Sequence, residues 1–206
     1  MFASERETGA VQRLLPKLPG EPVVCFRHTL STEALSCGGF LCHQLLFVTT
    51  GQGRAVSTGD KKLGAFVLSP GTALVIPPQR RLHVMPELQM VPLEIWTVSF
   101  HGQALSLPQS VVQVLSNTVH VFQPKRPVQR ELLQKLHALQ AEMTRRDWAT
   151  PAALRLIVEH MLISLVRENP RFQHLAAADA DDVDPAARVH KAVEYIEANL
   201  TEPVSL

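Results

Sequence analysis

The sequence lacks the features that mark a membrane-spanning or an exported protein. No apolar run approaches the roughly 18 residues needed to cross a bilayer. The first ten residues carry charges of both signs and no apolar stretch like that of a secretory signal. Only three cysteines are present, Cys25, Cys37 and Cys42, and an odd number cannot all pair internally. We therefore expect reduced thiols, a cytoplasmic location and no membrane partner.

An excess of basic residues is lacking as well. The 206 residues include 20 Lys and Arg against 19 Asp and Glu, a net charge of +1, whereas a free-standing nucleic-acid-binding domain is usually more basic. An apolar fraction of 46% with 19% charged residues argues against wholesale disorder. The length suits one domain, or one domain and a fragment.

The first 122 residues are typical of an all-β domain. Short apolar runs alternate with turns such as Gly51-Gln52-Gly53, Ser69-Pro70-Gly71 and Pro77-Pro78. Regularly spaced short strands favour a sandwich or a barrel. The expected strands are 23–28, 40–49, 54–57, 65–68, 73–76, 82–85 and 93–100.

Two helices are expected after residue 122. Pro127 suits a first helical turn, and Thr150-Pro151 is typical of an N-cap followed by the first residue of a second helix, which would run to Asn169. The first helix has one apolar stripe, with Leu133 on its flank. This apolar stripe either packs on the barrel or pairs with a second copy of the chain, and we favour a two-fold homodimer. The predicted dimerisation residues are Leu132, Leu133, Leu136, Leu139 and Met143.

The C-terminal part of the sequence predicts a linker and one more helix. Residues 171–184 include the small, acidic run AAADADDVD, which has no side chain to anchor a core. Apolar residues from Val189 to Leu200 form a helical stripe, and Pro203 ends it. Ser205 is a plausible N-cap of a further helix.

The order of these parts resembles the AraC family of bacterial transcription regulators. The resemblance rests on HQLLFVTTGQG (43–53), FVLSPGTALVIPP (66–78), His83 and EIWTVSFHG (94–102). It implies an N-terminal arm (1–22), a cupin-like effector-binding barrel (23–122), a helical pair for dimerisation (123–170), a linker (171–184) and the first helix of a helix-turn-helix domain (185–206). The overall class would be α+β. The implied partners are a small-molecule effector, a second copy, and DNA through a helix-turn-helix domain largely absent from this chain.

Three positions depart from the family pattern, one of them Val84, where some members have an aromatic residue that contacts the effector. The residue after Pro70-Gly71 is commonly Asp in the family and is Thr72 here. The residue after Pro77-Pro78 is commonly Gly and is Gln79 here.

Alternation along the strands predicts the lining of an effector pocket. In a small barrel every second residue points inward, so His43 and Phe47 would share one inner face, and Trp96 and Phe100 another. Such a lining is apolar and aromatic with a few polar groups, as in small-molecule sites. The resemblance adds His83, which with Trp96 stands where family members tend to contact effector. The predicted ligand-binding residues are His43, Phe47, His83, Trp96 and Phe100, and plain core packing is the alternative for Trp96 and Phe100.

The chain is expected not to be an enzyme. Metal-binding cupins resemble one another in a His-x-His pair and a Glu before the first Gly-x-Gly turn and in a later His. Here the first three positions hold Cys37, Gly39 and Gln44, and only the later His83 is present, which is too few ligands for a catalytic metal. We expect no catalytic residue and no cofactor. The alternatives that stay open are a metal-dependent cupin enzyme, a regulator with a zinc or other metal site built from Cys37, Cys42, His43 and His83, a redox-sensing regulator that uses Cys37, and a non-catalytic binding module with no DNA role.

Overall fold

The computed structural model describes most of the chain between Val23 and Phe172. The described residues are 23–57, 64–87, 91–102, 105–145, 147–170 and 172. The predicted arm (1–22), nearly all of the predicted linker (171–184) and the predicted last helix (185–206) lie outside them. None of the described helices is long and apolar enough to cross a membrane.

All seven expected strands form, and two short strands join them. The strands are β1 (Val23–Leu30), β2 (Leu35–Gly38), β3 (His43–Thr50), β4 (Gly53–Ser57), β5 (Ala65–Leu68), β6 (Ala73–Ile76), β7 (Arg81–Pro86), β8 (Leu93–Phe100) and β9 (His120–Phe122). The helices are α2 (Gln109–Asn117), α3 (Arg126–Arg145) and α4 (Thr150–Glu168). The sequence did not predict β2, α2 or β9.

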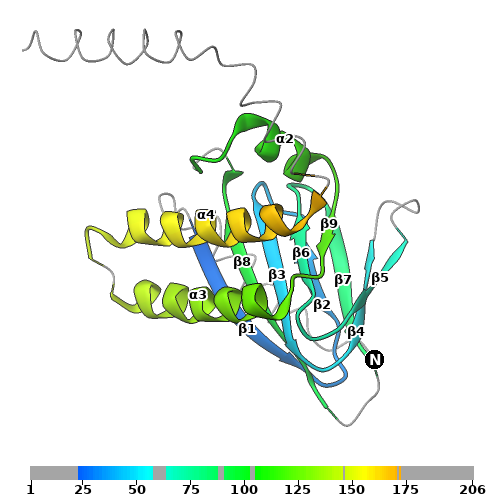
Figure 1. Ribbon diagram of the computed structural model, residues 1–206. Helices are drawn as coiled ribbons and strands as arrows, with labels where there is room; N and C mark the ends of the chain where they lie inside the picture. The colour runs from blue at the N-terminus through cyan, green and yellow to red at the C-terminus, as the bar shows by residue number, and fades with distance from the viewer. Residues whose placement is uncertain are drawn as a thin grey trace, which may run out of the picture.

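The strands form two antiparallel sheets that face each other. One sheet has the order β1-β8-β3-β6-β9 and the other β2-β7-β4-β5. The helices α3 and α4 lie side by side across the outer face of the five-stranded sheet, and α2 lies at one end of the sandwich (Figure 1). This is the predicted fold class, a cupin-like β sandwich with added helices, and the prediction is confirmed.

The five-stranded sheet is buried on both faces. On β3 and β8, partners in register point to the same side, as do Leu45 with Val98 and Leu46 with Thr97. One side, which carries Leu45 and Val98, joins a core with residues of all three helices. The other side, which carries Leu46, joins the core between the two sheets. The molecule therefore has two apolar cores that share one sheet.

The residues predicted to face the interior of the barrel face the helices instead. His43, Phe47, Trp96 and Phe100 lie on the helix-facing side of the five-stranded sheet, whereas the sandwich interior takes the alternate residues. Strand periodicity is 2, so a shift of one residue exchanges the faces. Both alternating sets of β3 and β8 are mostly apolar, and periodicity alone cannot distinguish them.

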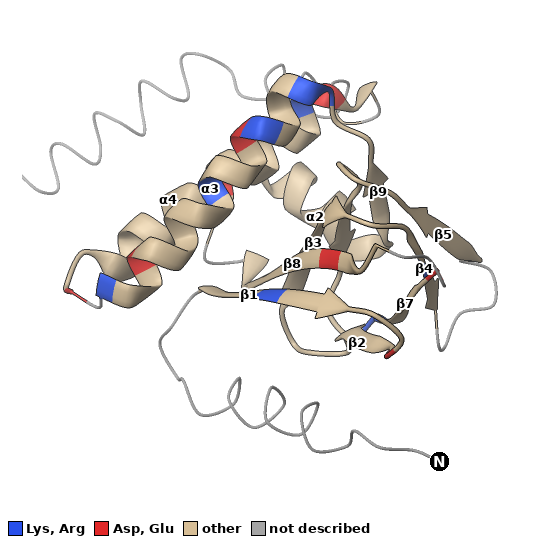
Figure 2. Cartoon of the chain, turned by 90° about the horizontal axis from the view of Figure 1, so that it is seen from below, with Lys and Arg blue, Asp and Glu red and all other residues tan. Residues whose placement is uncertain are grey.

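The apolar stripe of α3 packs within the chain. Leu132, Leu136 and Leu139 are buried against the five-stranded sheet and α4, with Met143 at the margin. Charged residues lie on the outer side of the helical layer (Figure 2). The expectation that this stripe is the centre of a dimer interface is therefore wrong for the three buried leucines, because they are not available to a second copy. Leu133 is half-buried.

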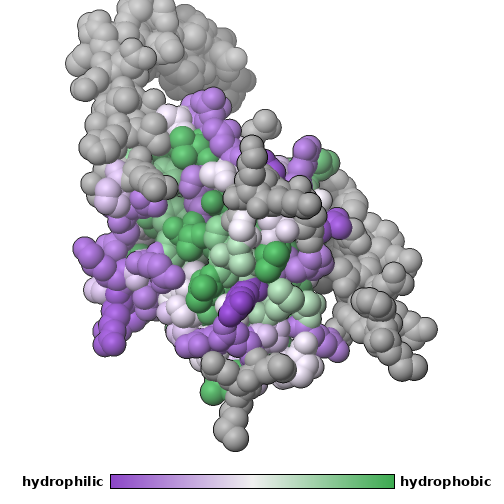
Figure 3. All heavy atoms as spheres, turned by 90° about the vertical axis from the view of Figure 1, so that its right-hand side faces the viewer, coloured by the Kyte–Doolittle hydropathy of each residue, from purple (hydrophilic) through white to green (hydrophobic). Residues whose placement is uncertain are grey.

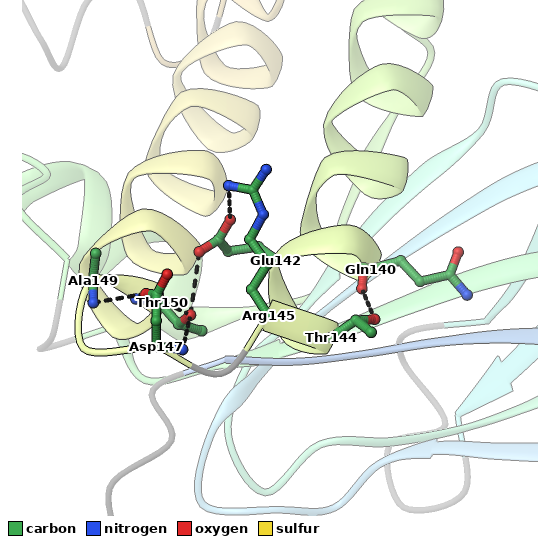
Figure 4. Close-up of polar contacts among 7 residues, drawn as sticks. All are labelled: Gln140, Glu142, Thr144, Arg145, Asp147, Ala149 and Thr150. Atoms are coloured by element: carbon green, nitrogen blue, oxygen red, sulfur yellow. Dashed lines mark hydrogen bonds and ion pairs between the residues drawn. The ribbon is translucent and has the colours of Figure 1, made fainter.

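The start of α4 is capped differently from the prediction. Thr150 is the first residue of the helix, and the Asp147 carboxylate accepts hydrogen bonds from the backbone N–H groups of Ala149 and Thr150 at 2.9 and 3.0 Å (Figure 4). The Thr150 hydroxyl in turn accepts from the Asp147 N–H at 3.1 Å. This reciprocal arrangement satisfies N–H groups that have no partner inside the helix.

Shortening Leu136 should be far more costly than shortening Leu133. Leu136 is fully buried in the core below α3, so Leu136→Ala should lower the free energy of unfolding by about 2–5 kcal/mol. The half-buried Leu133 is the matched control, and Leu133→Ala should cost about 1 kcal/mol or less. Urea unfolding measures both. Equal costs would contradict the orientation of α3 described here.

Replacing Gln79 with glycine should stabilise the fold. Gln79 has φ 65°, the only positive φ of a non-glycine residue among those described, and a side chain in this region costs about 1 kcal/mol. Gln79→Gly should therefore raise the free energy of unfolding by up to about 1 kcal/mol. Gln79→Ala retains the Cβ atom and should give no gain. A destabilised glycine variant would show that the Gln79 side chain contributes more than the backbone strain costs.

Candidate functional site

The sandwich interior is closed to ligands. Leu46, Val48, Leu74, Ile76 and Ile95 are each 0% exposed, and so are the four residues that face them from the four-stranded sheet, Ala55, Leu68, Leu82 and Val84. A side chain with no exposed surface has no water-sized space beside it. Two pockets lie where helices meet the five-stranded sheet, one toward each end of its central strand β3.

His43 lies at the start of β3, beneath α2. Its Nε2 lies 2.9 Å from the Ser116 hydroxyl, which donates its proton to the carbonyl of Val112 at 2.7 Å. Nε2 must then be the donor to Ser116, which leaves Nδ1 as an acceptor. Nδ1 is buried and has no hydrogen-bond partner among the described residues. The imidazole also stacks on Phe100, with ring centroids 5.4 Å apart and planes at 12°.

A pocket of about 500 Å³ opens beside His43. We call it the α2 pocket. Gly102 forms part of its wall, and a Cβ atom there would come within 2.7 Å of the His43 ring, so this position has no room for a side chain. The residues that line the pocket are Leu41, His43, Pro78, His101, Gly102, Gln109, Val112, Gln113 and Ser116.

The electrostatics of the α2 pocket favour a neutral imidazole. Burial lowers the pKa of His43 below its ordinary value of 6.5, and repulsion from His101 lowers it further. Two glutamine amides of α2 add donors and acceptors without charge. Since the Ser116 proton points to Val112, the Ser116–His43 pair is not arranged as a nucleophile and its base. The geometry suits the binding of a small polar molecule.

The α2 helix connects this pocket to the far end of the described chain. His120 of β9 donates from Nε2 to the carbonyl of Val114 in α2 at 2.9 Å. The His120 ring meets Phe172 edge-on at 5.2 Å, and Phe122 stacks on Phe172 at 5.8 Å. A shift of α2 would therefore reach Phe172, which lies within the predicted linker (171–184).

The other predicted ligand-binding residues lie elsewhere. Phe47 borders a separate pocket beside α3. Trp96 is buried beneath α3, where His137 meets its ring edge-on at 5.3 Å. His83 is on the outer face of the four-stranded sheet, since its neighbours in register are Ser36 and Val56 and the alternate residues Leu82 and Val84 fill the interior. This face, over β4, β5 and β7, mixes apolar and polar side chains (Figure 3). Two pairs of the predicted residues are therefore neighbours in register on the helix-facing side, His43 with Phe100 and Phe47 with Trp96, whereas His83 lies apart from them.

The residues that sequence reasoning missed lie mostly on α2. Val111, Val114 and Leu115 have helical spacing just after Pro108, and this signal was available in the sequence. His101 and Gly102 belong to the EIWTVSFHG motif, but nothing in the sequence placed α2 above them.

The residues proposed for a metal or redox site lie in different parts of the fold. Cys37 is inside the sandwich, His83 is outside it and His43 is on the helix-facing side. Within the described ranges no three His, Cys, Asp or Glu residues are placed to share a metal ion. Burial raises the pKa of Cys37 to about 12 and also raises that of Cys42. The prediction of an accessible, reactive thiol at Cys37 is therefore wrong.

Comparison with known proteins gives likenesses of structure only. No family model matches the sequence, and no curated protein matches it. The chain is similar to apo ToxT from Vibrio cholerae, with a TM-score of 0.48, 7% identity, and coverage of 74% of this chain and 57% of ToxT. ToxT with a bound unsaturated fatty acid gives a TM-score of 0.44 and 8% identity over 70% of this chain and 55% of that one. FeII HppE gives 0.34 and 18% identity over 38% and 43%. The chain thus spans little more than half of ToxT, and these figures describe fold alone.

Acidification should weaken the fold through His43. The unfolded imidazole binds a proton near pH 6.5, more readily than the buried one, because burial lowers the pKa of His43. Stability is therefore fully present above that pH and falls as the pH drops below it. Chemical unfolding between pH 7.5 and 5 should show a smaller loss for His43→Gln than for the wild type.

The variant His28→Gln provides a comparison. Burial also lowers the pKa of His28, so this variant should flatten the pH dependence too, and the double variant should flatten it further. A His43→Gln variant whose curve runs parallel to that of the wild type would contradict the assignment of His43 as a buried, neutral imidazole.

Proposed function

We propose that the chain is the sensor region of a transcription regulator of AraC type, and that a small-molecule effector binds in the α2 pocket. Three features support this function. The sequence has the order of parts found in that family, the fold is the cupin-like sandwich with helices that the order implies, and a polar pocket lies beside His43.

The observation that carries the proposal is the path from the α2 pocket to the end of the described chain. On α2, the Ser116 hydroxyl is hydrogen-bonded to His43, and the Val114 carbonyl is hydrogen-bonded to His120. The rings of His120 and Phe122 in turn pack against the ring of Phe172. A ligand that shifts α2 has a direct route to the segment predicted to carry a DNA-binding domain.

The mechanism would be a population shift. An effector that binds one position of α2 more tightly than another changes the balance between them by its difference in affinity. Phe172 would transfer that difference to residues 171–184 and so to the placement of the DNA-binding parts. Effector affinity and DNA affinity would then be coupled reciprocally.

The pocket also limits the chemistry of the effector. The lining of the α2 pocket contains no Lys, Arg, Asp or Glu, and a neutral His43 offers hydrogen bonds together with the amides of Gln109 and Gln113. We infer an uncharged, polar effector. A homodimer remains part of the proposal, on a face other than the one made by Leu132, Leu136 and Leu139.

A thermal-shift screen against a library of small metabolites tests the proposal. A true effector at 100 times its Kd stabilises by about 2.7 kcal/mol, which corresponds to roughly 5–10 °C in Tm for a chain of this size. Gln113→Trp, at the exposed rim of the α2 pocket, should remove the shift.

Gln134→Trp is the matched control, because Gln134 is exposed on α3 and lines neither pocket described here. This variant should respond like the wild type. Compounds that stabilise Gln113→Trp as strongly as the wild type would place the effector elsewhere. A library without any stabilising compound would contradict the sensor function.

A further inference from the structure

A second pocket lies at the start of α3, on the opposite side of the helical layer from the α2 pocket. It measures about 340 Å³ and shares no lining residue with the α2 pocket. Apolar walls come from β3, from the turn before β6 and from α3, and polar groups come from α3 and the end of β3. The lining residues are Phe47, Val48, Thr49, Pro70, Gly71, Arg126, Gln129, Arg130 and Leu133.

The start of α3 carries positive charge where a helix disfavours it. Arg126 is the first residue of α3, Lys125 precedes it, and Arg130 follows one turn later, while the first turn contains no acidic residue. The N-terminal end of a helix is already positive, and like charges four residues apart repel each other. Charged residues gather at this end of the helical layer, next to β9 (Figure 2).

The nearby carboxylates are engaged with other groups. Glu168 accepts the backbone N–H of Lys125 at 3.1 Å. Glu94, which contacts Thr49, is paired with Arg27 at 2.9 Å. Glu131 is bound by His160 and Ser164 at 3.3 and 3.0 Å. Across the described part of the chain, neither Arg126 nor Arg130 forms an ion pair, so this local conflict has no internal compensation. Such conflicts are typical of functional sites.

The floor of the pocket is held in place by backbone contacts. Gly71 has φ 89°, and its N–H donates to the Val48 carbonyl at 2.9 Å. The side chain of Gln129 lies directly over Gly71 and donates to the Pro124 carbonyl at 2.7 Å. A Cβ atom at position 71 would overlap the side-chain amide of Gln129, so only glycine leaves this arrangement intact. The site is therefore shaped before any ligand binds.

We propose that this pocket binds a small organic carboxylate with a compact apolar body. The guanidinium groups of Arg126 and Arg130 match a carboxylate in geometry and charge. The ring of Phe47, with Pro70 and Leu133, provides the apolar surface that an inorganic anion would not use. The proposal does not depend on the regulatory role inferred for the α2 pocket.

Calorimetric titration of the full chain with 3-phenylpropionate tests this proposal. The probe has a carboxylate and a phenyl ring, and a ligand of this size is expected to bind with a Kd of about 0.1–1 mM. Its amide, 3-phenylpropionamide, has the same shape without the charge and should bind at least tenfold more weakly. Inorganic phosphate has charge without an apolar body and should also bind at least tenfold more weakly.

Variants separate the two halves of the site. Arg126→Gln and Arg130→Gln should each weaken 3-phenylpropionate binding about threefold to tenfold. Leu133→Ala should weaken it as well, while leaving the weak binding of phosphate unchanged. Arg145→Gln is the matched control, because Arg145 is an exposed arginine at the far end of α3, and it should bind like the wild type.

Each other result would overturn the proposal. Equal binding of acid and amide would show that the arginines do not recognise the charge. Phosphate that binds as tightly as 3-phenylpropionate would reduce the pocket to an anion site without apolar selectivity. No binding of any probe, or binding unaffected by both arginine variants, would exclude the site altogether. A compound that binds in the α2 pocket is detected by its loss in Gln113→Trp, so the two sites are tested separately.

Discussion

The burial of one sheet on both faces governs the rest of this structure. The five-stranded sheet closes the sandwich on one side and supports α3 and α4 on the other. Without the helical layer, the sandwich would expose one apolar face of this sheet to water, so the helices are required for folding. Because both cores are close-packed, a ligand cannot enter either without displacing side chains. The two pockets lie where α2 and the start of α3 meet the two ends of the central strand β3.

This arrangement explains how far the sequence predicts the fold. The seven expected strands and the two long helices carry strong signals, namely turn residues between apolar runs and a leucine stripe of helical period. These signals do not show which face of each strand points to the interior of the sandwich. On β3, His43, Leu45 and Phe47 alternate with Gln44, Leu46 and Val48, and both sets are buried. A strand that is mostly apolar on both faces gives no information about which side is the interior.

The candidate site was predictable only in part, for a related reason. His43 was selected as an inward-facing residue, and it reaches a pocket because α2 covers the helix-facing side at the end of β3. Trp96 and Phe100, chosen by the same argument, became core residues beneath the helical layer, as the alternative of plain packing allowed. The side chain of His83 faces outward, since its neighbours Leu82 and Val84 face the interior. Sites formed between a short helix and a sheet edge depend on contacts distant in sequence, which a single sequence does not reveal.

The most direct test of the central account is hydrogen–deuterium exchange of the intact chain with and without a stabilising small molecule. If the sandwich interior is closed and α2 carries the response, bound ligand should slow exchange in α2 and in β9, with a smaller effect at Phe172. The strands β2, β4, β5 and β7 should exchange as before. Protection confined to those four strands would contradict the account, because it would place the ligand inside the sandwich.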